Sequence, residues 1–155
     1  MRTIRRTDRI LDNQRAVELL HTGEYGFLAM VNADGGGYAI PISYAATEGA
    51  IYFHCAPEGH KLDNLRSENR VTFTVVGHTG VVPDKFTTAY ESVMVFGSVE
   101  EVSDDDERLL ALRLLVKKYS AGHEEVAEKY IKGSFHRTAV LKLVIQSLTA
   151  KAKVI

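Results

Sequence analysis

The sequence predicts one α+β domain, mainly β, in which a six-stranded antiparallel split β-barrel carries peripheral helices. The chain of 155 residues is 45% hydrophobic and 25% charged, which is typical of a single domain with one packed core. The early strand-like segments follow one another without the helices that a doubly wound parallel sheet needs between them. Closing those strands into a barrel also removes the exposed edges of an open sheet. No repeat or flexible linker divides the chain, so we expect residues 1–155 to form a single domain.

The first half of the chain alternates turn signals with short apolar runs. A helix is predicted over 13–22, with Asp12 as its N-cap and Gly23 as its C-terminal stop. A glycine-rich turn over 32–37 joins two apolar runs into a hairpin. The predicted strands of this half cover residues 25–31, 38–45 and 51–55.

The second half is expected to hold three helices and three strands. The segment 77–90 is rich in Gly, Pro, Asp and Thr and is interpreted as a long loop, and Gly97 predicts a bulge in the strand that follows. Ser103 is the expected N-cap of an acidic helix start, which suits the helix dipole. The predicted helices cover 60–67, 104–119 and 124–131, and the predicted strands cover 71–76, 91–102 and 138–148.

The charge balance argues against nucleic acid and anionic membranes as partners. There are 19 Lys and Arg against 20 Asp and Glu, and a formal net charge of −1, whereas a nucleic-acid binder needs a basic excess. No apolar run approaches the ~18 residues needed to cross a bilayer, and no apolar segment follows the basic start at residues 1–6. The single cysteine, Cys55, cannot form an internal disulfide. We therefore expect a cytoplasmic protein.

The most informative segment joins a strand to a short helix. The strand ends at His54 and Cys55, and after a tight loop a helix begins near His60. A helix N-terminus presents unpaired N–H groups that suit a phosphate; His60 and Lys61 add side-chain donors there, and Gly59 lets the backbone come close. Lys61 as a merely solvated lysine is the alternative, but a cation at this end opposes the helix dipole unless an anion is present.

The same segment also contains residue types that are found in zinc sites and in Cys–His nucleophiles. His54, Cys55 and His60 are zinc-ligand types, but adjacent strand residues point to opposite faces and no second cysteine pair follows, so no metal site is expected. A Cys–His nucleophile fails on the same geometry. Cys55 is therefore interpreted as a small apolar side chain at a strand end.

Several stretches together resemble a known family. They are Gly23–Gly26, Pro41–Tyr44, Ile51–Ala56, Gly59–Leu65, Lys85–Gly97 and Glu128–Ile131. With these stretches the sequence resembles the pyridoxamine 5′-phosphate oxidase-related flavoproteins, and within them most closely the 5-nitroimidazole resistance (Nim) group. The resemblance runs from about Met1 to Leu148, and its two long central blocks are the specific ones.

The resemblance implies a split barrel that binds FMN at the interface of a homodimer, with FAD as the alternative flavin. By position, a backbone segment would run along the flavin, a strand end would lie against its ring or ribityl chain, and a basic pair would hold its phosphate. Phe86 and Tyr90 would wall the pocket. The backbone segment is Pro41, Ile42 and Ser43, the strand end is His54 and Cys55, and the basic pair is His60 and Lys61. Ser92 would be a further flavin contact.

The resemblance also implies an activity: reduction of a small electron-poor molecule, such as a nitroimidazole, with electrons from a reduced nicotinamide or another donor. The flavin would carry the redox chemistry. His54 would donate a proton, or would only pack on the flavin. The vitamin oxidases carry an Arg-Lys pair where this chain has His60-Lys61, and a C-terminal Trp that this chain lacks. Oxidation of pyridoxamine phosphate is therefore not expected.

Two alternatives stay open on the same barrel. One is a non-enzymatic flavin or haem carrier or sensor, with His54 or His60 as an axial ligand. The other is a deazaflavin-dependent reductase, whose polyanionic cofactor tail would need more basic residues than the region of Lys61 and Arg66 offers.

Overall fold

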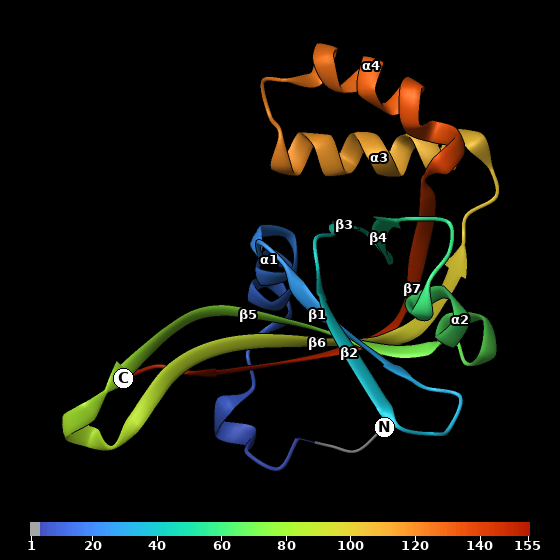
Figure 1. Ribbon diagram of the computed structural model, residues 1–155. Helices are drawn as coiled ribbons and strands as arrows, with labels where there is room; N and C mark the ends of the chain where they lie inside the picture. Colours follow the sequence, from blue (N-terminus) through green and yellow to red (C-terminus); the bar gives the residue numbers. More distant parts are fainter. Residues whose placement is uncertain (1–3) are drawn as a thin grey trace.

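Seven antiparallel strands form a single sheet in the computed structural model, which describes residues 4–155 (Figure 1). The start of the basic N-terminal segment therefore lies outside the described residues. The strand order across the sheet is β2-β1-β5-β6-β7-β4-β3. The strands are β1 (Gly26–Val31), β2 (Gly37–Ile42), β3 (Ala45–Thr47), β4 (Ala50–Cys55), β5 (Arg70–Val82), β6 (Thr87–Glu101) and β7 (Ala139–Lys153).

The two edges of the sheet meet at one corner without closing. β2 and β3 are the outermost strands, yet only Ser43 and Tyr44 separate them along the chain. Two residues span less than about 11 Å, so the edges approach each other there while no ladder joins them. The α+β class is confirmed, and the open seam agrees with a split barrel. The seventh strand arises because the strand predicted over 38–45 breaks at this corner into β2 and β3.

The loop predicted over 77–90 is wrong, because most of that segment is strand. β5 and β6 continue their ladder through pairs such as Thr79 with Tyr90 and Val82 with Thr87, after an irregularity beyond Val76. The turn itself is a short 3-10 helix, η2 (Pro83–Lys85). Glycines and threonines suggested a loop, but the pairing partner supplies what local propensity lacks. The resulting hairpin extends from the body together with the end of β7 (Figure 1).

The helices lie close to the predicted ranges, with one corrected cap. The carboxylate of Asp104, and not Ser103, caps α3 by accepting a hydrogen bond from the Glu107 amide at 2.8 Å. Asp12 caps α1 as predicted. No helix within residues 4–155 is both long and apolar enough to cross a bilayer. The helices are α1 (Asn13–Thr22), α2 (His60–Ser67), α3 (Asp105–Tyr119) and α4 (Glu124–Ser134), with 3-10 turns η1 (Thr7–Arg9) and η3 (Phe135–Arg137).

The bulge predicted at Gly97 is confirmed. The register between β6 and β7 shifts between Phe96 and Gly97. A side chain at Gly97 would collide with the carbonyl oxygen of Val144, so only glycine lets the two backbones approach this closely.

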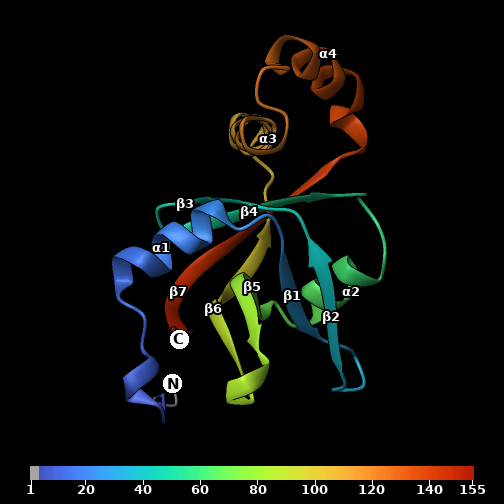
Figure 2. The same cartoon turned by 90° about the vertical axis from the view of Figure 1, so that its left-hand side faces the viewer.

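Two apolar cores lie on either side of β4. The larger fills the barrel and includes Phe53 and Phe73, whose rings meet edge to face at 5.2 Å. The smaller lies under the α3–α4 helical hairpin and includes Tyr52, Leu112 and Ile131. β4 is therefore buried on both faces over its first four residues, which explains its continuous apolar run. Figure 2 shows α3 and α4 stacked over the β3–β4 edge.

A cluster of three side chains fixes the corner between β2 and β3. Tyr44 is fully buried and its hydroxyl donates to the carbonyl of Leu20 at 2.5 Å. The hydroxyl of Tyr119, at the end of α3, accepts from the Tyr44 amide at 2.9 Å and donates to the carbonyl of Glu24 at 2.7 Å. The Lys118 amine lies 3.6 Å from the centre of the Tyr44 ring. Within residues 4–155 that amine is buried without a hydrogen-bond partner.

Lys118→Met tests the cost of that amine. Burial lowers the pKa of Lys118 from 10.5 to about 8, despite the attraction of the Tyr44 ring. The unfolded chain therefore binds more protons than the folded one between these two values, and this group makes the free energy of unfolding rise with pH. We expect the stability of Lys118→Met relative to wild type to fall between pH 7 and pH 10 in denaturant titrations. The exposed neighbour variant Lys117→Met should track wild type; a Lys118→Met difference independent of pH would contradict the account.

Candidate functional site

The start of α2 presents free backbone donors. Gly59 precedes the helix with φ +129°, a conformation that favours glycine, and no side chain caps the helix. Its carbonyl accepts from the amides of Leu62 and Asp63. Among the described residues no acceptor meets the amides of His60 and Lys61. Two N–H groups and the positive end of the helix dipole thus face outward at the position predicted for a phosphate.

A hydrogen-bond network orients His60. Its Nε2 lies 2.9 Å from the side-chain oxygen of Asn32, which also accepts from the buried amide of Asn64 at 2.9 Å. Because this oxygen can only accept, Nε2 carries a proton and Nδ1 is left for a ligand. The ring of Tyr38 packs on His60 at 4.2 Å. Neither Asn32 nor Asn64 has a role predicted from the sequence, although Asn64 lies within the Gly59–Leu65 stretch that resembles the family.

Lys61 is a half-buried cation whose charge reaches both residues at the end of β4. It lies within hydrogen-bonding reach of the Cys55 thiol and within electrostatic reach of His54. No carboxylate in residues 4–155 forms a salt bridge with Lys61. Burial raises the pKa of the Cys55 thiol, and Lys61 only partly opposes this. Cys55 is therefore a neutral thiol packed against the barrel core, as its strand-end position indicated.

His54 and Ser43 line a cavity of about 410 Å³ between β4 and the α3–α4 hairpin. The β3–β4 register, which pairs Ala45 with Tyr52, places Ser43 opposite His54 when it is continued. His54 and Cys55 therefore point to opposite sides, as alternation along a strand requires. His54 keeps an exposed edge, but partial desolvation of its ring beside the cavity lowers its pKa, and the charge of Lys61 lowers it further.

The remaining predicted residues of the β2 segment point in two directions. Pro41 is exposed on the outer face of the sheet, and Ile42 is half-buried against the barrel core. Ser43 lines the cavity, so the three consecutive residues face the outer surface, the barrel core and the cavity in turn. The structure thus brings Ser43, His54 and the start of α2 into one neighbourhood.

An exposed apolar face extends across five strands. Phe27 and Met94 on this face are 42% and 39% exposed, and a hollow of about 420 Å³ there is lined in part by Ala29, Thr72 and Phe96. Neighbouring strands place uncharged residues side by side in two rows. These are Pro41, Phe27, Thr74, Met94 and Thr149, and then Ala39, Ala29, Thr72, Phe96 and Ser147.

Ser92 lies on the same outer face but far from the start of α2 within one chain. It pairs with Lys151 of β7, whereas His54 pairs with Val140 at the other end of that strand. The two positions are eleven residues apart, or roughly 36 Å of extended strand. Phe86 and Tyr90 lie further along the same hairpin, and Phe86 is 96% exposed. These residues are not brought together with His54 in a single chain.

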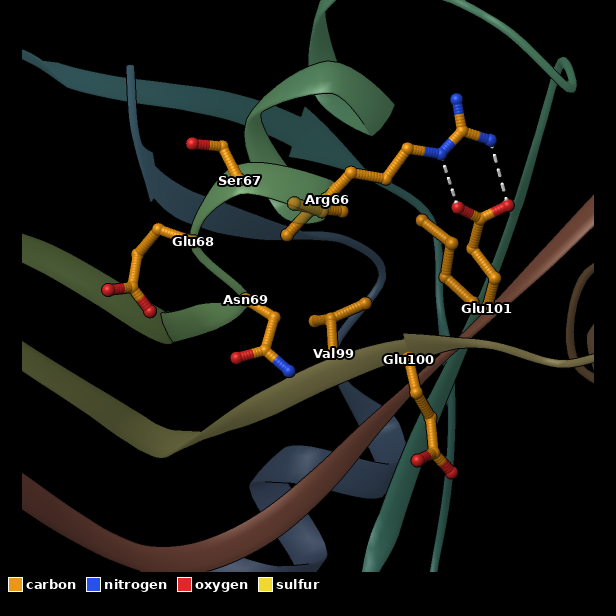
Figure 3. Close-up of a pocket in the computed structure, with 9 residues that line it drawn as sticks. Arg66, Ser67, Glu68, Asn69, Val99, Glu100 and Glu101 are labelled. Atoms are coloured by element: carbon orange, nitrogen blue, oxygen red, sulfur yellow. Dashed lines mark hydrogen bonds and ion pairs between the residues drawn. The ribbon is translucent and has the colours of Figure 1, made fainter. Parts of the chain in front are cut away.

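A further hollow, of about 320 Å³, lies at the end of α2 and carries mostly negative charge (Figure 3). Arg66 turns toward Glu101 and binds it with two hydrogen bonds of 2.6 and 3.0 Å. Glu68 and Glu100 also line this hollow. Glu68 is likewise paired with Arg70, and Glu100 lies 3.9 Å from Lys142, so this hollow offers no unpaired cation to an anion.

These features define the class of protein: an antiparallel split barrel, open between β2 and β3, with free amide donors at the start of α2. The sequence profile described as pyridoxamine 5′-phosphate oxidase matches residues 12–152. The chain belongs to that family.

Solved structures share the fold at low sequence identity. A candidate 5-nitroimidazole antibiotic resistance protein from Bacteroides thetaiotaomicron has a TM-score of 0.77 and 23% identity, with 93% of this chain and 86% of that chain covered. A flavocytochrome from Azotobacter vinelandii has a TM-score of 0.85 and 20% identity, with 99% and 73% covered. An FAD-binding protein from Mesorhizobium loti has a TM-score of 0.69 and 22% identity, with 94% and 98% covered. A search of the curated proteins found no match.

The titration of His54 tests the electrostatics of the site. Because burial and Lys61 both disfavour the imidazolium, we expect His54 to titrate below its ordinary value when its ring signals are followed by NMR against pH. Lys61→Met removes a positive neighbour and should raise the pKa of His54, whereas Lys117→Met should not move it. A His54 titration that is insensitive to Lys61 would show that the two side chains do not interact.

Proposed function

We propose that the chain binds FMN, with the phosphate at the start of α2, and acts as a redox protein on small electron-poor molecules. The single observation that carries the proposal is the set of donors at that helix: two amides without an acceptor in the described chain, Lys61 without a carboxylate, and His60 with Nδ1 left open. A cation at a helix N-terminus is unfavourable unless an anion is bound. The donor set fits a terminal phosphate group.

The charges beyond this site favour a mononucleotide over a longer anionic cofactor. The hollow at the other end of α2 holds three glutamates and one arginine that is already paired. A polyanionic deazaflavin tail that extended in that direction would find no unpaired cation, because each glutamate there already has a basic partner. FAD is a ligand of the solved relative from Mesorhizobium loti, and an adenylate on this chain would have to leave by another route. FMN is therefore the cofactor we propose.

A homodimer is the assembly that we propose for flavin binding. The five-strand outer face is apolar, uncharged along two rows and exposed, and monomers rarely leave such a contiguous face open. Ser92, which matches a flavin-contacting position of the family, lies on this face and far from Lys61 in the same chain. A second copy packed on the face would bring its own Ser92 toward the site, as a two-fold interface allows.

In this proposal the flavin would supply hydride and electron transfer. The residues of the chain would position the flavin and the substrate and exclude competing reactions. Ser43 and His54 would border the ring on the cavity side, since both line that cavity. A neutral His54 can donate one hydrogen bond, or accept one, without bringing charge to the cavity. The candidate nitroimidazole resistance protein among the solved relatives supports a nitro compound as substrate, with a reduced nicotinamide as the electron donor we propose.

A comparison of FMN with riboflavin tests the phosphate site. Riboflavin lacks the phosphate, so wild type should bind FMN more tightly by about 10- to 100-fold, the worth of one or two charge-assisted hydrogen bonds. Lys61→Met should weaken FMN binding by about tenfold or more and leave riboflavin binding unchanged. Affinities are measured by quenching of flavin fluorescence, with Lys117→Met as the matched control. Equal affinities of wild type for the two flavins would refute the assigned phosphate site.

Met94→Glu tests the dimer. It places a carboxylate on the apolar outer face, where two symmetric copies would bury like charges against each other. We expect wild type to be a dimer by light scattering, and the variant to be a monomer with FMN affinity reduced by about tenfold or more. Val126→Glu introduces the same charge at a position of α4 that is 67% exposed and should change neither property. A dimeric Met94→Glu with full FMN affinity would contradict the proposed interface.

A further inference from the structure

We infer that the cavity between β4 and the α3–α4 hairpin is a binding pocket for a small, uncharged, mainly apolar molecule held at its polar end by His54 and Ser43. The inference deepens the proposed function, on which it rests for its redox meaning, by naming the substrate class. The residues involved lie outside those assigned to flavin binding, apart from Ser43 and His54 at the shared boundary.

The walls of the cavity are apolar and preformed. α3 contributes Leu112, Leu115 and Val116, and α4 contributes Ile131. Leu112, Leu115 and Ile131 are already buried, so the wall does not have to collapse or reorder when a ligand enters. A volume of about 410 Å³ lies in the range of small-molecule sites, which are lined mainly by hydrophobic side chains with a few polar groups.

Polar side chains line the cavity on the strand side and also at the helix ends, where Tyr119, Ser120, Tyr130 and Ser134 contribute. His54 and Ser43 lie opposite each other by register, and Thr138 lines the cavity just before β7 begins. The hydroxyls of Thr138, Ser134 and Tyr119 already donate to backbone carbonyls. On the strand side, His54 and Ser43 therefore offer the donors that are open to a ligand. A ligand would therefore point its hydrogen-bond acceptors at β4 and its apolar body at α3.

The lining carries no permanent charge. Among the described residues around the cavity there is no Asp, Glu, Lys or Arg. The nearest cation on the same helix turn, Lys118, is directed to the Tyr44 ring and is not part of the wall. A charged group entering this space would lose its hydration without gaining a partner, which is costly. The pocket therefore selects against phosphorylated and carboxylated molecules.

The cavity has an exposed rim, formed by Ser43, His54, Ser120 and Tyr130. Ile131 is the only side chain of α4 that is buried, and Tyr130 beside the cavity is 73% exposed. The Arg113–Glu128 ion pair joins α4 to α3 at 2.7 and 3.0 Å, but both side chains are about half exposed and such pairs stabilise little. A ligand can therefore enter at the exposed rim while the buried wall residues Leu112, Leu115 and Ile131 stay in place.

The test uses two matched probes, neutral nitrobenzene and anionic 4-nitrobenzoate, added to the FMN-loaded protein and to the FMN-free protein without any reductant. We expect nitrobenzene to shift the NMR signals of Val116, Ile131 and the His54 ring in both forms, and 4-nitrobenzoate to leave them unchanged. Shifts confined to the outer sheet face, or equal binding of the two probes in the cavity, would overturn the inference.

A filled pocket supplies the second readout. Val116→Phe adds volume at the cavity wall and should weaken nitrobenzene binding by about tenfold or more. Leu110→Phe makes a similar change on the same helix at a position that is 52% exposed and outside the lining, and should stay within about twofold of wild type. The wild-type shift map remains decisive if Val116→Phe does not fold. Unchanged affinity in a folded Val116→Phe variant would overturn the assignment.

These outcomes separate the pocket from the cofactor. A protein that takes no FMN but binds nitrobenzene in the cavity keeps the pocket and loses the proposed function. A protein that binds FMN through Lys61 but leaves the cavity signals unmoved by nitrobenzene keeps the proposed function and loses the pocket.

Discussion

The hydrogen bonds around Tyr44 are the constraint on which the site depends. Between β2 and β3 the chain crosses from one edge of the sheet to the other in two residues, and Tyr44 is held there by Leu20 on one side and Tyr119 on the other. This contact ties the end of α3 to the open seam of the barrel. It therefore fixes Ser43 opposite His54 and sets the height of the α3–α4 hairpin above β4. Ser43 and Tyr119, which both line the cavity, are held in place by this contact.

Three surfaces of the molecule differ in charge and polarity. The start of α2 presents backbone donors and a cation without a carboxylate partner, and the outer sheet face carries two uncharged central rows. The cavity under α3 is lined by uncharged wall residues, with His54 at one end. Lys61 links two of them, because the charge that suits an anion also adds to the effect of burial in lowering the pKa of His54. The hollow beyond Arg66 offers an anionic ligand no unpaired cation, because its glutamates are already paired with basic residues.

Local features were predictable from the sequence, and features made by distant segments were not. The cap of Asp12 and the unpaired donors at the start of α2 depend on neighbours along the chain, so their spacing predicted them. The bulge at Gly97 was predictable because glycine within a strand is itself the signal, although its cause is the Val144 carbonyl of β7. The bonds of Asn32 to His60 and Asn64 join positions about thirty residues apart, and a polar turn residue such as Asn32 has an ordinary local explanation. The segment 77–90 has the composition of a loop, and its strand structure comes from the pairing of β5 with β6, which local composition does not reveal. The cavity went unrecognised because its walls looked like ordinary core positions of α3.

The central claim is that this chain carries a flavin mononucleotide, and the chromophore of the purified protein tests it most directly. The protein is purified without added cofactor, its visible spectrum is recorded, and any released chromophore is identified by mass. The account predicts a flavin spectrum and released FMN, or stoichiometric uptake of FMN added at micromolar concentration. A colourless protein that ignores added FMN would contradict it, and so would a haem Soret band in place of the flavin spectrum.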